Sequence, residues 1–196
     1  PVANSIVQAA VNTMGTDTIA AWGICDKLDM LIWLLADAMG PALTTYTAQN
    51  MGAGRWDRVC KGNRIGAAMS VAAVGAVSLG LYFLTAPLGG LFVPVQDAPE
   101  VVPQAAAFMR RMAPFFLFYA LAESFSGACC GTGDTVRPMI LTLLSICLLR
   151  VLGILLLLPR QHTMECIIDI YIASWIAAGI GFLSLWQWEK KRVQKA

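Results

Sequence analysis

The fold is decided by an uncharged stretch, IGAAMSVAAVGAVSLGLYFLTAPLGGLFVPVQ, at residues 65–96. It is longer than the roughly 20 apolar residues that an α-helix needs to cross the hydrocarbon core of a bilayer. A second uncharged stretch occupies residues 170–188. Both stretches therefore predict transmembrane helices.

The composition of the whole chain agrees with a membrane protein. Of its 196 residues, 58% are hydrophobic and 13% are charged, and the mean hydropathy is +0.65. Too little polar surface remains to cover a globule in water. The net charge of +2 and the lack of a stripe of interleaved basic and aromatic residues also exclude nucleic acid as a partner.

The predicted fold class is all-α, a polytopic bundle of about six transmembrane helices that forms one domain over residues 1–196. Two further spans are interrupted only by Glu123 and Arg150. A long helical pattern near the N-terminus exceeds the bilayer thickness, and the first segment has about half a span's length, which indicates truncation. The predicted spans are residues 1–14, 18–50, 65–88, 104–131, 138–159 and 167–188.

Basic residues predict the orientation. They cluster in the segment after the long helix and in the C-terminal tail, and cytoplasmic loops carry an excess of Lys and Arg. We therefore expect a multi-pass protein of the plasma (inner) membrane with a cytoplasmic C-terminus. The residues concerned are Arg55, Arg58, Lys61, Arg64, Lys190, Lys191, Arg192 and Lys195.

The long helix carries an acidic stripe. An α-helix turns by 100° per residue, so we measure the angular position of each side chain around the helix from Asp26. The other members of the stripe are Asp29, Trp33, Asp37 and Thr44, at about 300°, 340°, 20° and 0°. A charged Asp at mid-membrane costs about 2.5–3.5 kcal/mol, so this face predicts a cation-binding cavity that includes Asp26, Asp29 and Asp37. Alternatively, Asp26 and Asp29 lie at the wet interface, and only Asp37 is deep and pairs with Arg150.

Glu123 is the sharper candidate for cation binding. It lies mid-span with Tyr119 and Ser126 on the same helix face, so Tyr119 joins the predicted site. A carboxylate removed from water can exchange a proton for a cation near neutral pH. The alternative is a structural hydrogen bond or ion pair. Arg150 is expected to be a structural charge partner, because a fixed positive charge repels a cationic substrate.

Enzymatic chemistry is not indicated. The GTGDT sequence at residues 131–135 lacks the preceding strand and the Lys of a phosphate-binding loop. The single histidine, His162, has no convergent Ser or Cys partner in the sequence. We therefore predict that the protein is not an enzyme and needs no cofactor beyond a coupling ion.

Two motifs stand out in the sequence: QNMGAGR at residues 49–55, and GTGDT at residues 131–135 followed by Arg137 and Pro138. Together they resemble the multidrug and toxic compound extrusion (MATE) family. In that family the motifs follow the eighth and tenth transmembrane helices, some 80 residues apart, as here. The motif residues expected in turns are Gln49, Asn50, Gly52, Gly54, Gly131, Gly133, Asp134 and Pro138.

The resemblance implies that the chain is the C-terminal lobe of a twelve-helix antiporter. Such a protein exchanges sodium ions or protons for organic cations, and its partners are the lipid bilayer, those cations and the N-terminal lobe. Glu123 lies on the helix where that lobe supplies an acidic cation ligand, which makes it a possible sodium site. Two other readings stay open: a non-transporting membrane scaffold, or a flippase of lipid-linked precursors.

Overall fold

A computed structural model describes the backbone of residues 2–193 and the side chains of residues 4–193. Within this range it contains helices and no strand, which confirms the predicted all-α class. The elements are α1 (Val2–Val11), α2 (Thr16–Gly52), α3 (Trp56–Gly89), α4 (Ala98–Met112), η1 (Ala113–Phe115), α5 (Phe116–Gly131), α6 (Val136–Thr142), η2 (Leu143–Leu148), α7 (Leu149–Leu157) and α8 (Met164–Val193).

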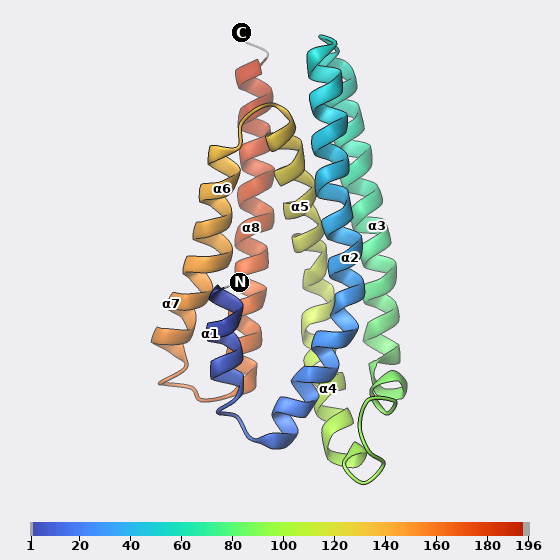
Figure 1. The fold of residues 1–196 in the computed structure, drawn as a ribbon, viewed down its shortest axis with the longest axis vertical. Coiled ribbons are helices and arrows are strands. Elements are labelled where there is room, and N and C mark those ends of the chain that lie inside the picture. The colour runs from blue at the N-terminus through green and yellow to red at the C-terminus, as the bar shows by residue number, and fades with distance from the viewer. Residues whose placement is uncertain (1, 194–196) are drawn as a thin grey trace.

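These elements join into six long or short helical segments that run roughly parallel (Figure 1). A single 3₁₀ turn connects α4 to α5, and a π-helical stretch connects α6 to α7, so each pair crosses the bundle as one segment. Four segments are long and apolar enough to span a membrane: Trp56–Gly89, Ala98–Gly131, Val136–Leu157 and Met164–Val193. The long but polar α2 and the short α1 are not among these four.

One boundary differs clearly from the sequence prediction. The segment between Gly52 and Arg64 was expected to be a basic loop, but only residues 53–55 form a turn and α3 begins at Trp56. A helix that leaves the membrane keeps its internal hydrogen bonds in water, so charged residues do not end it. Arg58, Lys61 and Arg64 therefore lie on the first turns of α3.

The two ends of the bundle differ in charge. The turn between α2 and α3, the turn between α5 and α6, and the end of α8 lie at the same end (Figure 1), which we call the basic end. Its cationic residues are Arg55, Arg58, Lys61, Arg64, Arg137, Lys190, Lys191 and Arg192. Lys195, assigned to the same cluster, lies outside the described residues.

Helices α2 and α5 pack with their backbones unusually close. A Cβ atom on Gly127 would collide with the backbone of Gly40, and one on Gly131 would lie 2.6 Å from the carbonyl oxygen of Thr44. Small residues allow such an approach between membrane helices. This contact fixes the position of α5 beside the acidic helix α2.

The glycines of the two family motifs, at residues 49–55 and 131–135, have different roles. Gly54 and Gly133 adopt positive φ angles of 69° and 93° in the turns after α2 and α5, a conformation that costs other residues strain. Gly52 and Gly131 are instead the last residues of those helices. Pro138 lies in the first turn of α6, where a missing N–H leaves no helical hydrogen bond unmade.

Candidate functional site

Two carboxylates meet at one tyrosine in the middle of the bundle. The Tyr119 hydroxyl on α5 donates a hydrogen bond of 2.6 Å to Oδ1 of Asp37 on α2. The side chain of Glu123, one turn further along α5, interacts electrostatically with both Tyr119 and Asp37. The structure therefore brings three of the five predicted binding residues together.

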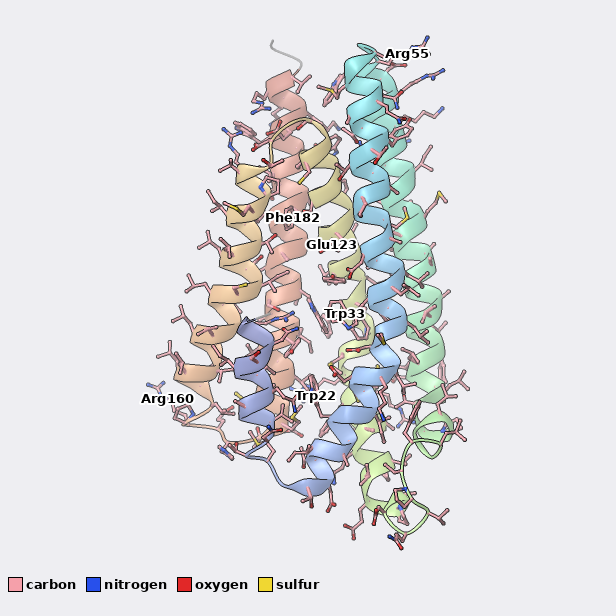
Figure 2. All side chains as sticks on the ribbon, in the orientation of Figure 1. Trp22, Trp33, Arg55, Glu123, Arg160 and Phe182 are labelled. Atoms are coloured by element: carbon pink, nitrogen blue, oxygen red, sulfur yellow. The ribbon has the colours of Figure 1, made fainter. Side chains whose placement is uncertain are left out.

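The carboxylate pair lies beside an open groove. This groove has a volume of about 400 Å³ and is lined by α2 and α5. Its lining includes Glu123 and Ser126 on α5, together with Pro41 and Thr44 on α2. Glu123 lies at mid-height between the two helices (Figure 2). A ligand in this groove can reach the Glu123 carboxylate without entering the packed core.

Pro41 adds a backbone oxygen to the same place. It lies inside α2, and proline has no N–H to donate to the carbonyl four residues earlier, which belongs to Asp37. Thr44 and Thr45 donate their hydroxyls to the carbonyls of Gly40 and Pro41, at 2.9 and 3.0 Å. The Asp37 carbonyl thus lacks its helical donor close to its own carboxylate.

Aromatic residues connect this pair to the remainder of the acidic stripe. The Trp33 ring lies edge-on to Tyr119, with centroids 4.4 Å apart, and Trp33 follows Asp29 by one turn of α2. Asp29 is only 5% exposed, and its Oδ1 has no hydrogen-bond partner among the described residues. Figure 2 shows Trp33 below Glu123, on the side away from the basic end.

Asp26 lies apart from the carboxylate pair. It is exposed and borders a polar hollow of about 390 Å³ between α1, α2 and α8, which Asn4 and Tyr171 also line. It still interacts electrostatically with Asp29, three residues along the same helix. The stripe thus runs from an open hollow at Asp26 to the groove at Glu123. Thr44 bonds to backbone carbonyls of Gly40 and Gly127 and serves packing.

Arg150 is buried but does not pair with Asp37. Within residues 4–193 it forms no ion pair, so the pairing considered from the sequence is not found. Its guanidinium lies 4.0 Å from the centroid of the Tyr171 ring, and it donates to Ser174 (2.9 Å) and to Asn4 (3.3 Å). Contact with an aromatic face partly replaces a carboxylate partner.

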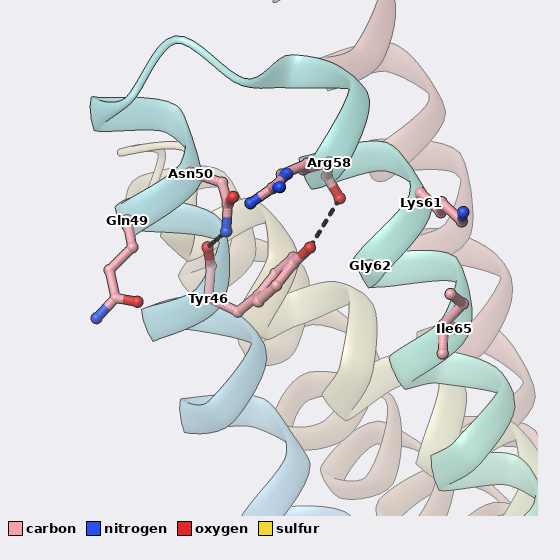
Figure 3. Close-up of a pocket in the computed structure, with 7 residues that line it drawn as sticks. All are labelled: Tyr46, Gln49, Asn50, Arg58, Lys61, Gly62 and Ile65. Carbon is pink, nitrogen blue, oxygen red and sulfur yellow. Dashed lines mark hydrogen bonds between the residues drawn. The ribbon is translucent and has the colours of Figure 1, made fainter.

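The first family motif, at residues 49–55, lies at the basic end of the bundle. A hollow of about 520 Å³ lies there. Among the residues that line it, Tyr46 donates to the Arg58 carbonyl at 3.1 Å (Figure 3). Gln49 and Asn50, which were expected in a turn, instead lie in the last helical turn of α2. Asn50 donates to the Tyr46 carbonyl (2.8 Å), and the Gln49 carbonyl accepts from Ala53 (3.1 Å). These contacts close the α2–α3 turn.

The second family motif, at residues 131–135, belongs to an ionic network that the sequence did not predict. Asp134 accepts a hydrogen bond of 2.6 Å from Arg137, which also lies 3.5 Å from the fully buried Glu189 of α8. Arg192 pairs with Glu189 at 3.0 Å. Although burial opposes it, hydrogen bonding from Arg137 holds the pKa of Asp134 below its usual range. The network joins the α5–α6 turn to α8.

Several residues around Arg150 lack a sequence signal. Asn4, Ser174 and the π-helical stretch just before Arg150 read as ordinary transmembrane residues. Their roles depend on which helices become neighbours. No group of three His, Cys, Asp or Glu side chains within the described residues could hold a metal ion. Any cation at the carboxylate pair would also need hydroxyl or carbonyl oxygens as ligands.

Known proteins resemble this chain over most of its length. The MatE family profile matches residues 1–156. Probable multidrug resistance protein YoeA of Bacillus subtilis is 20% identical over 194 residues, which cover 96% of this chain and 41% of that protein. Probable multidrug resistance protein NorM of Thermotoga maritima is 26% identical over 132 residues, 67% of this chain and 28% of that protein. The chain thus spans less than half the length of these relatives.

Proposed function

Because this chain belongs to the MatE family, we propose that it forms the C-terminal half of a secondary-active antiporter that exports organic cations, driven by a sodium or proton gradient. The names of its relatives, which describe multidrug resistance proteins, support export of drugs. The observation that carries the proposal is the meeting of two carboxylates at Tyr119, which donates to Asp37 and interacts electrostatically with Glu123, beside an open groove.

The carboxylate pair is suited to alternate between two cationic occupants. Two neighbouring carboxylates repel each other, and a cation bound between them removes this repulsion. A coupling ion at Asp37 and Glu123 would satisfy both groups, and the Asp37 carbonyl freed by Pro41 would add an oxygen ligand. An organic cation in the groove would compete for the same negative charge. This competition is the exchange step of the proposed antiport.

The acidic stripe offers a route for the coupling ion. Asp26 opens on the polar hollow, and Asp29 and Trp33 lie between it and Tyr119. The basic end would face the cytoplasm by the positive-inside rule, which places the Asp26 hollow on the outer side of the plasma membrane. The coupling ion would then enter from outside, as inward-directed gradients require.

The acidic groove also separates this proposal from its rivals. A flippase of lipid-linked precursors must accommodate anionic phosphate groups, which two carboxylates would repel. A scaffold needs no open groove beside a carboxylate pair, of which Asp37 is exposed and Glu123 is partly buried. The groove therefore favours a cationic substrate.

Ethidium efflux tests the proposal. The full-length protein that carries this chain is reconstituted in proteoliposomes, and efflux is driven by a sodium or pH gradient. Glu123→Gln keeps the size of the side chain and removes its charge, so we expect coupled efflux to fall at least tenfold with unchanged insertion. Glu165→Gln, at an exposed position at the start of α8, is the matched control. Wild-type efflux from the Glu123 variant would refute the assignment.

A further inference from the structure

A separate hollow at the basic end combines cations with an apolar floor. It has a volume of about 510 Å³ and lies between the ends of α3 and α8, each of which packs against α5. Lys61 and Arg64 line it from α3, and Lys190 lines it from α8. The floor consists of Phe125, Leu183 and Trp186.

This hollow faces away from the proposed transport groove. Phe125 follows Glu123 by two residues, which places the two side chains about 200° apart around α5. The groove is lined by α2 and α5, whereas the hollow is lined by α3, α5 and α8. If the groove faces the transport path, the hollow opens on the opposite side of the bundle, where lipid surrounds a membrane protein.

The three cations of the hollow are available to a ligand. None of them forms an ion pair within residues 4–193, whereas neighbouring Arg137 and Arg192 are held by the buried Glu189. One acidic residue, Asp57, shares the lining, so positive charge is in excess. Convergent unpaired cations at a membrane interface attract anions.

The apolar floor of the hollow favours an anion that also carries an apolar part. Leu183 is 39% exposed, while Phe125 and Trp186 are 7% and 3% exposed and close the bottom of the hollow. A soluble phosphate would gain nothing from this apolar surface, whereas a phospholipid can place its first methylenes there while its phosphate meets the cations. Tryptophan at this depth is typical of the membrane interface.

We propose that this hollow binds the headgroup of an anionic phospholipid such as phosphatidylglycerol. Lys61 and Arg64 contact the phosphate from one side and Lys190 from the other, so the lipid bridges α3 and α8. The bound lipid would hold these two helices at a fixed separation on the face opposite the groove.

Native mass spectrometry of the full-length protein, released from micelles with equal amounts of phosphatidylglycerol and phosphatidylcholine, tests the proposal. We expect at least a tenfold preference for phosphatidylglycerol. The variant K61Q/R64Q/K190Q should lose at least tenfold of it, since each interfacial Lys or Arg contributes about fivefold. The control R55Q/R58Q/K191Q removes the same charge from exposed positions of the same end outside this hollow and should retain the preference.

Three results would overturn the proposal. They are equal binding of the two lipids, an unchanged preference in the triple variant, and displacement of the lipid by an equal concentration of inorganic phosphate, which would identify a soluble anion site. Unfolding temperatures in zwitterionic micelles report whether the variants fold. If the triple variant does not fold, Lys190→Gln is compared with Lys191→Gln, and only the former should weaken binding, about fivefold.

Discussion

The close contact between α2 and α5 predicts a large effect from a single methyl group. In Gly127→Ala, the new Cβ would lie within 2.9 Å of the Cα and carbonyl carbon of Gly40 and closer still to its carbonyl oxygen. Backbone atoms cannot rotate away as a flexible side chain can. The helices must therefore move apart by about 1 Å to regain ordinary van der Waals contact.

The magnitude follows from a comparison with Gly80→Ala on α3, where a Cβ would meet no atom within 4 Å. Both substitutions gain the same helix propensity of about 1 kcal/mol, so this contribution cancels. The difference between them is the cost of overpacking, about 1–3 kcal/mol in the free energy of unfolding. The same movement would stretch the 2.6 Å hydrogen bond from Tyr119 to Asp37 to about 3.6 Å, which is no longer a hydrogen bond.

Two assays check this prediction. Equilibrium unfolding in mixed micelles, followed by tryptophan fluorescence, should place Gly127→Ala about 1–3 kcal/mol below Gly80→Ala. Gradient-driven ethidium efflux should fall in Gly127→Ala and stay normal in Gly80→Ala. Equal unfolding midpoints would refute the close approach, and lower stability with normal efflux would separate the packing of α2 and α5 from the function of the carboxylate pair.

Two further predictions concern the charged residues outside the carboxylate pair. Arg150→Lys should lower the free energy of unfolding by about 1–3 kcal/mol, because lysine cannot keep both the planar contact with Tyr171 and the buried hydrogen bonds. Arg160→Lys, at an exposed position, should change the free energy of unfolding little. Equal effects of the two substitutions would contradict a structural role for Arg150. Asp134→Asn should reduce thermal stability at neutral pH, because hydrogen bonds from Arg137 keep the pKa of Asp134 low in the folded protein. That stability is present above the ordinary aspartate pKa of about 4 and is lost as the pH falls further, so the variant and the wild type should converge in acid melts; a constant difference would contradict the assignment.

The sequence predicted the helical segments well because lipid leaves the backbone few choices. A chain that crosses hydrocarbon must satisfy its hydrogen bonds internally, so each long apolar run became a helix. Where helices end in water this constraint disappears, and there the prediction failed: α3 begins at Trp56 rather than at residue 65. The positive-φ glycines Gly54 and Gly133 marked turns correctly, since their chemistry is local.

The site was only partly predictable, because it depends on which helices become neighbours. A helical projection places Asp37 on the polar face of its helix, but it cannot show that the hydroxyl of Tyr119, 82 residues away, will meet it. The same limit explains Arg150, for which a carboxylate partner was considered and which instead contacts the Tyr171 ring. Asp29 and Asp26 share the stripe yet differ in burial, which the projection also omits.

The proposed cation site and the tightest helix contact belong to one interface, and this has a mechanical consequence. Tyr119 and Glu123 lie on the helix whose Gly127 contacts Gly40, one turn beyond Asp37. If the separation of α2 and α5 alters cation affinity, thermodynamic linkage requires that cation binding alter that separation by the same free energy. Pro41 lies beside this contact and removes one hydrogen bond that would stiffen α2. Binding of the coupling ion to the carboxylate pair should therefore move the part of α2 that lines the groove. This movement would change the affinity of the groove for the organic cation.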